Sequence, residues 1–356
     1  MNPVRLLQQL IALPSFSRSE NATADLLFSE MDSLGFSVRR FRNNIWVLQP
    51  SFDPAKPTLL LNSHHDTVRP TDAYTRDPFS PEIIDGRLYG LGSNDAGASV
   101  VALMSVFEKF HNRILPFNLL LAITAEEEVT GENGMRAFLP HLERQGIAIS
   151  MALVGEPTGM QPAVAERGLV VLDCLTSGKS GHAARGEGVN ALYRAIEDIE
   201  ALRNFRFPSE SRILGPVGLQ VTVIEAGRQH NVVPAECRWV VDVRTTDAYS
   251  NEETVDLLSR VVKNSSLTPR STRVRASVIE NSHPMVKAAV MMGGMPFVSP
   301  TTSDMSQMAA FPSLKMGPGK SERSHSADEF VEIAEIENAI LKYETYINNL
   351  SHIFEL

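Results

Sequence analysis

Two hydrophobic spacings alternate along the N-terminal part of the chain. Short apolar runs indicate strands at 45–48, 58–62, 118–124 and 151–154, and the last three are continuous, which is typical of strands buried on both faces. Other segments have apolar residues at the helical period, which predicts helices at 21–34, 96–110 and 132–145. Strands that alternate with helices predict an α/β fold, a mostly parallel sheet flanked by helices.

The pattern changes after Gly168. Alternating and apolar segments there predict three strands and two helices, at 169–176, 190–204, 218–225, 235–244 and 251–263. This order suits an antiparallel sheet with helices on one face, so residues 167–278 are expected to form an inserted α+β domain. Residues 1–166 and 279–356 are expected to form the other domain, which ends in a helix at 333–348.

Composition narrows the classes of function. The chain of 356 residues has 33 Lys and Arg against 42 Asp and Glu, and this net charge of −9 argues against a nucleic-acid partner. Its two cysteines, Cys174 and Cys237, lie in apolar stretches and are expected to be reduced core residues. No apolar run approaches the roughly 20 residues needed to cross a bilayer, and the first residues lack the pattern of a signal peptide. We therefore expect a soluble, cytoplasmic protein that makes no membrane contact.

Acidic and histidine side chains follow three of the predicted buried strands. The first is followed by Ser63–Asp66, the second by Glu126–Glu128 and the third by Gly155–Pro157. A Gly-rich turn at 90–95 also delivers Asp95 to the start of a helix. Each motif alone is weak, but ligands in open parallel sheets bind beyond the carboxyl ends of the strands. The set together therefore predicts one site at that edge.

The residue types indicate a metal. One histidine with several carboxylates and no thiolate suits Zn²⁺, Mn²⁺ or Co²⁺ in a catalytic site, and a bridging carboxylate could join two ions about 3.5–4 Å apart. Strand alternation places His64 and Asp66 on one face, so that Asp66 can accept a hydrogen bond from the distal ring nitrogen of His64. His65 points the other way and is expected to be structural.

These motifs together resemble a known family. Residues 63–68, Asp95 with its turn, 124–128, 155–158, 181–182 and 317–325 follow one another as in the dinuclear zinc amidohydrolases. That family includes acetylornithine deacetylase, succinyl-diaminopimelate desuccinylase, aminoacylases and glutamate carboxypeptidases, and the resemblance covers nearly the whole chain. It implies a zinc-aminopeptidase-like catalytic domain, with residues 167–278 as a lid and dimerisation domain.

The resemblance also implies roles for individual residues. Two divalent ions, Zn²⁺ in the first place and Co²⁺ or Mn²⁺ otherwise, would be held by His64 and Glu156, by Glu128 and His325, and by Asp95 as the bridge. Glu127 would be the general base and later the acid, with Asp66 supporting His64. The alternative register, Glu126 as base and Glu127 as ligand, is weaker because the family places the pair just before an apolar residue, here Val129.

Substrate contacts are implied in the same way. His182 would reach the site from a partner subunit and stabilise an oxyanion, which implies a homodimer formed through the inserted domain. Asn231 and Arg244 match positions near the substrate carboxylate, and the backbone N–H groups of Gly317 and Gly319 could bind the same anion. The ordinary alternatives are a loop histidine, a surface arginine and a tight turn.

The implied function is metal-dependent hydrolysis of an N-acyl amino acid, with N-acetylornithine deacetylation in arginine biosynthesis as the first expectation. N-acetylcitrulline, N-succinyl-ornithine, N-succinyl-diaminopimelate and peptide substrates are alternatives within the family. One departure is Gly97, where the family commonly has Lys or Arg. An NAD(P)-binding oxidoreductase is disfavoured because Asp95 stands where its third glycine is required. A scaffold protein without metal is disfavoured because every implied ligand is present.

Overall fold

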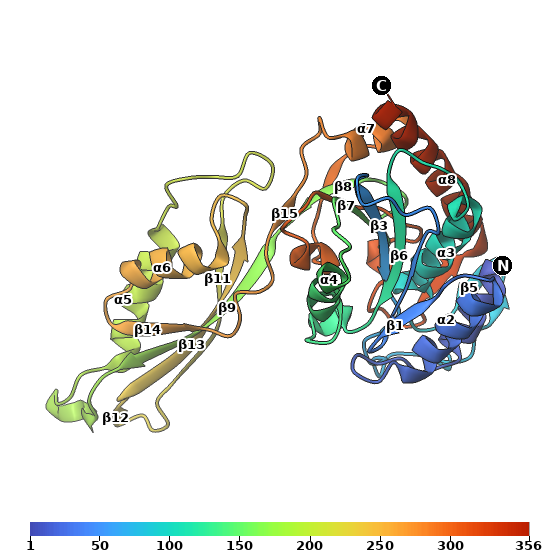
Figure 1. Ribbon diagram of the computed structural model, residues 1–356. Coiled ribbons are helices and arrows are strands. Elements are labelled where there is room, and N and C mark those ends of the chain that lie inside the picture. Colours follow the sequence, from blue (N-terminus) through green and yellow to red (C-terminus); the bar gives the residue numbers. More distant parts are fainter. Residues whose placement is uncertain (356) are drawn as a thin grey trace. The chain divides into compact units, whose positions relative to one another are not determined.

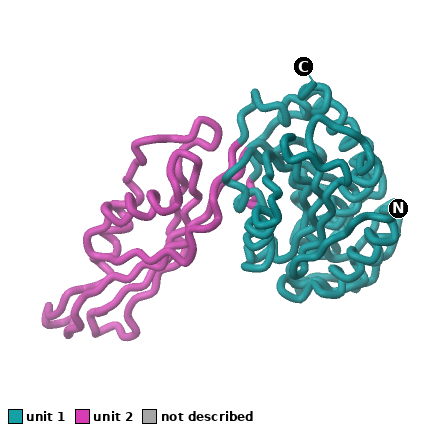
Figure 2. Tube along the Cα trace, in the orientation of Figure 1, with its two compact units in different colours: residues 1–164, 279–299, 303–356 teal, residues 165–278, 300–302 magenta. Residues whose placement is uncertain are grey.

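The computed structural model describes residues 1–355, and the chain forms two compact units. Unit 1 comprises residues 1–164, 279–299 and the segment from Ser303 to the C-terminus, and unit 2 comprises residues 165–278 with 300–302 (Figure 2). Within the described residues, no helix is long and apolar enough to cross a membrane.

Unit 1 is built on a mixed sheet whose central strands are parallel (Figure 1). In spatial order its strands are β1 (Arg39–Phe41), β2 (Asn44–Leu48), β6 (Asn118–Thr124), β3 (Thr58–His64), β7 (Met151–Val154), β17 (Ser313–Lys315), β8 (Ala163–Glu166) and β15 (Ser277–Val278). The four strands from β6 to β17 run parallel, and the strands at both ends are antiparallel to their neighbours. This confirms the predicted α/β class.

Helices cover both faces of this sheet. They are α1 (Pro3–Ile11), α2 (Asn21–Ser33), α3 (Ala98–Phe110), α4 (Met135–Arg144), α7 (Pro284–Met291) and α8 (Ile333–Glu355). Successive strand side chains alternate between faces: Leu59 and Leu61 of β3 join one core with α1, α2, α3, α7 and α8, whereas Leu60 joins the other with α4. All three are fully buried, which explains why the run is continuously apolar.

The element predictions for unit 1 are largely correct, with informative differences. Strand β3 continues to His64, beyond the apolar run, because His64 still pairs with Thr124 of β6. Helix α1 has no counterpart among the predicted elements. Its Pro3 in the first turn and its Asn2 cap are nevertheless helix-start signals. Helix α8 extends to Glu355, beyond the predicted end at Asn348, and Leu350 in this extension is buried.

A small antiparallel sheet also belongs to unit 1. Its strands are β4 (Ile83–Ile84), β5 (Arg87–Tyr89) and β18 (Phe330–Glu332), and β16 (Phe297–Ser299) pairs separately with β8. Because β5 pairs with β18, the chain just after β5 lies beside the chain just before β18. This pairing brings together the two segments that carry Asp95 and His325.

Unit 2 has an antiparallel sheet in the order β11 (Gly218–Ala226), β13 (Glu236–Thr245), β9 (Gly168–Ser177) and β14 (Ser265–Pro269). Helices α5 (Ala191–Asn204) and α6 (Asn251–Val261) share a core with it, and β10 (Gly181–His182) pairs with β12 (Val232–Val233). Strand β14 was missed because its polar Ser and Thr side chains hide the pattern. The lid and dimerisation role of this unit stays a prediction.

Candidate metal centre

The candidate site is built at the carboxyl ends of adjacent parallel strands. Register pairs His64 with Thr124 of β6 and Asn62 with Val154 of β7, so the residues after these three strands emerge at one edge of the sheet. Two further segments reach that edge. They are η1 (Ser93–Gly97), an irregular helical turn before α3, and the loop between β17 and β18.

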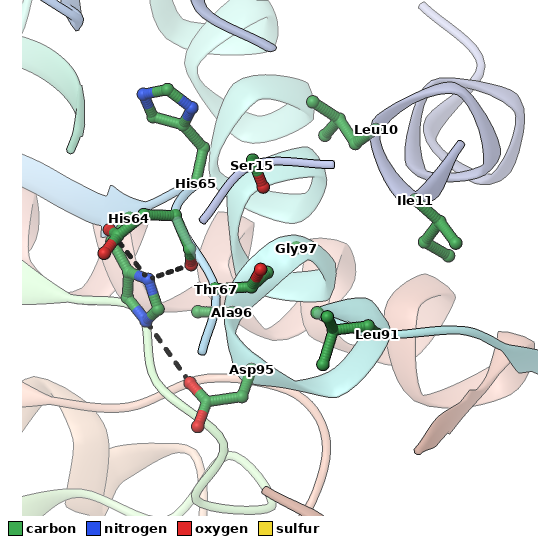
Figure 3. A pocket seen from close by; sticks show the side chains of 12 residues that line it. Leu10, Ile11, Ser15, His64, His65, Thr67, Leu91, Asp95, Ala96 and Gly97 are labelled. Carbon is green, nitrogen blue, oxygen red and sulfur yellow. Dashed lines mark hydrogen bonds and ion pairs between the residues drawn. The ribbon is translucent and has the colours of Figure 1, made fainter. Parts of the chain in front are cut away.

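His64 stands at the centre of the first ligand group. Its Nε2 lies 3.2 Å from Oδ1 of Asp95 and 3.5 Å from Oε1 of Glu156. Figure 3 shows the imidazole directed at Asp95 while His65 points away from it. These three side chains converge closely enough to hold one metal ion.

His325 forms a second group on the other side of Asp95. Its Nε2 lies 2.9 Å from Oε2 of Glu128 and 3.7 Å from Oδ2 of Asp95. Asp95 thus offers Oδ1 to the first group and Oδ2 to the second. The structure brings together all five side chains expected to bind metal, and Asp95 has the position that a bridging carboxylate requires.

The oxygen atoms of the ligand groups repel one another and would be stabilised by bound cations. Oε1 of the buried Glu156 has no hydrogen-bond partner among the described residues, although an unpartnered buried oxygen is costly. Burial and the nearby charge of Asp95 raise the pKa of Glu156 to about 8. For Glu127, burial raises the pKa well above its ordinary value, and Glu156, Asp304 and Glu128 add to this against the opposing effect of His64. A cluster of acids that repel one another in a buried site is the environment that divalent cations neutralise.

The two histidines respond to the same field of negative charge. Burial alone would lower the pKa of His64, but Glu127, Asp66 and Asp95 together raise it well above its ordinary value. The hydrogen bond to Glu128 raises the pKa of His325 to about 9. Each imidazole is therefore stabilised as a cation by these carboxylates, and a bound metal ion would replace the proton.

Asp66 has a wider role than the sequence suggested. The ring Nδ1 of His64 donates to the backbone oxygen of Asp66 at 3.0 Å, whereas the carboxylate is 3.5 Å away. The carboxylate instead accepts the backbone N–H groups of Glu127 at 3.0 Å and Glu128 at 3.2 Å, and the hydroxyl of Ser17 at 2.7 Å. It therefore holds the segment that carries the expected base and a ligand.

The three consecutive glutamates after β6 point in different directions. Glu126 has a left-handed backbone, with φ of 57°, and its carboxylate accepts the backbone N–H of Asn133 at 3.1 Å and the side-chain amide of Asn133 at 2.6 Å. Glu127 and Glu128 begin η2 (Glu127–Val129) and face His64. The engagement of Glu126 with Asn133 argues against the register with Glu126 as base, whereas Glu127 and Glu128 both lie close enough to His64 to share a metal ion with it.

His65 is bound on both ring nitrogens. Its Nδ1 lies 2.8 Å from the hydroxyl of Thr23, and its Nε2 donates to the backbone oxygen of Asn43 at 2.9 Å. Burial lowers the pKa of His65 to about 4, so this imidazole is neutral and structural.

The expected substrate contacts of unit 2 fall into two places. His182 pairs with Val232, next to Asn231, on the β10–β12 ribbon, which adjoins the Glu236 end of β13. Arg244 lies eight residues further along β13, a separation of about 26 Å at the rise of a strand. Its guanidinium pairs with Asp242 through two hydrogen bonds of 2.8 and 3.1 Å. Within unit 2, His182 and Asn231 are neighbours, and Arg244 is remote from both.

The two glycines of the 317–319 turn have packing roles. A Cβ on Gly317 would lie 2.6 Å from the backbone oxygen of Glu156, and the Gly317 N–H donates to the hydroxyl of Thr158. Gly319 has φ of 81°, and a Cβ there would lie 2.3 Å from Oδ1 of Asn94. These contacts favour the tight-turn interpretation over the binding of an anion by Gly317.

Two buried acids at the site escaped the sequence analysis. Asp304, at the start of η4 (Asp304–Gln307), accepts the hydroxyl of Thr124 at 2.8 Å and helps to raise the pKa of Glu127. Glu329 binds the Gly-rich turn through backbone N–H groups. Both lie far along the chain from the ends of β3, β6 and β7, whose following residues form the predicted site. The acidic pair Asp328-Glu329 was the one signal in the sequence.

Comparison with known proteins identifies the family. The model of peptidase family M20/M25/M40 matches residues 60–349, which is most of the chain. The chain belongs to this family. It is a metallohydrolase, in agreement with the sequence analysis.

One M20 relative is named succinyl-diaminopimelate desuccinylase, from Cereibacter sphaeroides. It is 30% identical over 95% of this chain and 96% of its own. Two solved structures share the fold. Aminopeptidase PepT from Bacillus cereus has a TM-score of 0.78 and 18% identity, with 98% of this chain and 99% of that chain covered. The YXEP protein from Bacillus subtilis, described as a dinuclear metal binding peptidase, has a TM-score of 0.74 and 14% identity, with 98% of both chains covered. The expected special likeness to acetylornithine deacetylase finds no support in these names.

We predict that Asp66→Asn lowers the free energy of unfolding by about 1–3 kcal/mol, because an amide nitrogen would face a buried N–H of Glu127 or Glu128. Urea unfolding of the chelator-treated protein measures this. Asp173→Asn is the control, because Asp173 pairs with Arg270 at the exposed surface and its loss should have a much smaller effect. Equal stabilities of the two variants would contradict the role given to Asp66.

Proposed function

We propose that the chain hydrolyses the amide bond of an N-acyl amino acid, with an N-succinyl amino acid such as N-succinyl-diaminopimelate as the first candidate. The observation that carries this proposal is the position of Asp95, whose two carboxylate oxygens face two separate ligand groups. The similarity to relatives named succinyl-diaminopimelate desuccinylase supports the succinyl group. N-acetylornithine, N-acetylcitrulline and N-succinyl-ornithine remain as further candidates within the same chemistry.

Two divalent ions fit the ligand groups, with Zn²⁺ as the first choice and Co²⁺ or Mn²⁺ as alternatives. His64 and Glu156 would hold one, Glu128 and His325 the other, with Asp95 shared. When bound, the ions would polarise the amide carbonyl and lower the pKa of a water molecule to about 7. The description of the YXEP protein as dinuclear supports the number of ions.

Glu127 is the candidate for proton transfer. Its side chain is 12% exposed, and its carboxylate lies 3.9 Å from Nε2 of His64 and faces the same site. A carboxyl group whose pKa is raised can accept a proton from the attacking water and deliver it to the leaving amine. The backbone N–H of Glu127 is held by Asp66, so the side chain starts from a fixed position.

The role of unit 2 is proposed from its own geometry. One substrate cannot touch both His182 and Arg244 of the same unit, because His182 lies on the ribbon next to the Glu236 end of β13 and Arg244 lies about 26 Å further along that strand. If both act on one substrate, His182 must come from a second chain, which supports a homodimer. Strand β11 is an edge strand with Val221, Val223 and Ile224 exposed, and an apolar edge of this kind suits pairing between subunits.

Arg244 would bind the substrate carboxylate by changing partner. The guanidinium of Arg244 is exposed and donates two hydrogen bonds to the carboxylate of Asp242 on the same strand. An exposed ion pair is weak enough for a substrate carboxylate to compete with it. Asn231, beside His182, would contact the substrate from the same side as that histidine.

We predict that purified protein binds two divalent ions per chain and releases amine from N-succinyl-diaminopimelate faster than from N-acetylornithine or a dipeptide. Chelation should abolish turnover and lower the melting temperature without unfolding the chain, because bound ions stabilise the native state by mass action. Metal analysis, amine release and melting curves measure these effects. Fewer than one ion per chain, with no rescue by Zn²⁺, Co²⁺ or Mn²⁺, would contradict the proposal. Faster turnover of N-acetylornithine would make N-acetylornithine, rather than N-succinyl-diaminopimelate, the first candidate substrate.

For the base, we expect Glu127→Gln to retain metal and to lose turnover by about 10²–10⁴-fold, because the amide cannot carry the proton. Glu126→Gln is the matched control, one residue away and directed at Asn133. It should keep most of the activity. Loss of turnover in Glu126→Gln with full turnover in Glu127→Gln would transfer the role to Glu126.

For the dimer, we expect His182→Ala and Glu127→Gln to be inactive alone and to recover about a quarter of wild-type activity when mixed in equal amounts. When the subunits pair at random, half of all the dimers contain one subunit of each variant, and each of these dimers has one intact site out of two. Subunit exchange is verified with two affinity tags. Confirmed exchange without recovery would mean that His182 acts in its own chain or has no part in turnover.

A further inference from the structure

Glu329 is a buried carboxylate bound by three backbone N–H groups of the turn that carries Asp95. Its Oε2 accepts the N–H of Gly92 at 2.9 Å, and its Oε1 accepts those of Asn94 at 2.8 Å and of Asp95 itself at 2.9 Å. The β5–β18 pair brings it there, with the N–H of Gly90 donating to the backbone oxygen of Glu329. The conformation of the Asp95 backbone is therefore set by Glu329.

Asn94 makes the reciprocal connection. Its side-chain Oδ1 accepts the N–H of Lys320 at 2.9 Å, and its Nδ2 donates to the backbone oxygen of Lys320 at 3.1 Å and the hydroxyl of Ser324 at 3.3 Å. The segment 320–329 is thus fastened to the Asp95 turn at both of its ends. His325 lies between the two attachments.

His325 needs this fastening more than the other ligands do. Its side chain is 54% exposed, so the packing of neighbours does not fix the imidazole. Its φ of 56° and that of Asp328, 53°, are left-handed values that non-glycine residues adopt only when their surroundings enforce them. The hydrogen bonds of Glu329 and Asn94 hold the 320–329 segment in this conformation.

The first ligand group does not depend on the same loop. His64 is the last residue of β3, and Glu156 follows β7, both in the buried centre of the sheet. Only Asp95 is common to both groups. A change at Glu329 should therefore act mainly on the group formed by Asp95, Glu128 and His325.

We propose that Glu329 is a positioning residue for the second cation site, which it assembles by holding the Asp95 turn and the His325 loop together. This inference rests on the proposed function, since it assumes that two cations bind. It assigns Glu329 no contact with the substrate or with the cations. A purely structural Glu329 would stabilise the whole protein without distinguishing between the two sites.

The test is Glu329→Gln, which keeps the volume but places an amide N–H₂ against backbone N–H donors. Zinc titration calorimetry of the chelator-treated full chain measures both binding events, and Co²⁺ absorption spectra report the geometry of each. We expect the second equivalent to bind about 10- to 100-fold more weakly, and the first, which shares only Asp95 with it, to be weakened much less. Asp328→Asn is the neighbouring control, because the carboxylate of Asp328 accepts hydrogen bonds from Thr75 and Arg76 and none from the Asp95 turn in the described structure.

Unchanged binding of both equivalents by Glu329→Gln, or equal weakening of both, would overturn the inference. Should this variant not fold, Asn94→Ala removes the other attachment and carries the same expectation and the same contrary results. Failure of the proposed function is distinguishable, because the wild-type chain would then bind fewer than two ions. Two tight sites in the wild type and in Glu329→Gln would contradict the positioning role alone.

Discussion

The candidate site depends on the crowding of acidic side chains at one buried edge of a parallel sheet. Backbone pairing in β6, β3 and β7 places the residues after each strand side by side, whatever their side chains. Negative charges brought together in this way repel one another, and burial leaves little water to screen them. The fold tolerates the arrangement because two imidazoles, many backbone N–H groups and, in our proposal, two cations compensate the charge.

The ligands are supported in two different ways. Strand ends hold His64 and Glu156 through the core of unit 1, so their positions follow from the packing of the sheet. Asp95 and His325 lie on irregular segments, and these are held by hydrogen bonds from Glu329 and Asn94. Asp95 is the ligand common to the group held by strands and the group held by hydrogen-bonded loops. A dinuclear centre built in this way would have one site set by the fold and one set by specific side-chain contacts.

In our proposal, catalysis and substrate specificity depend on different parts of the chain. The ligand groups and Glu127 belong to unit 1, whereas the residues expected to contact substrate, His182, Asn231 and Arg244, belong to unit 2. A protein named as a desuccinylase and a solved structure named as an aminopeptidase are similar to this chain over nearly its full length. The proposed metal centre is compatible with several amide substrates, because other residues would contact the part of the substrate beyond the amide.

Local sequence determined the elements that bury continuous apolar runs, and it placed the acids at their ends, because periodicity and strand termination are short-range properties. It missed α1 and β14, whose signals were caps and polar alternation, and it could not tell that Glu126 turns to Asn133 while its neighbours face His64. Only the tertiary structure brought Glu329 and Asp304 to the site. Such contacts join residues more than a hundred positions apart, and their geometry is decided by how strands and loops pack together rather than by any local pattern.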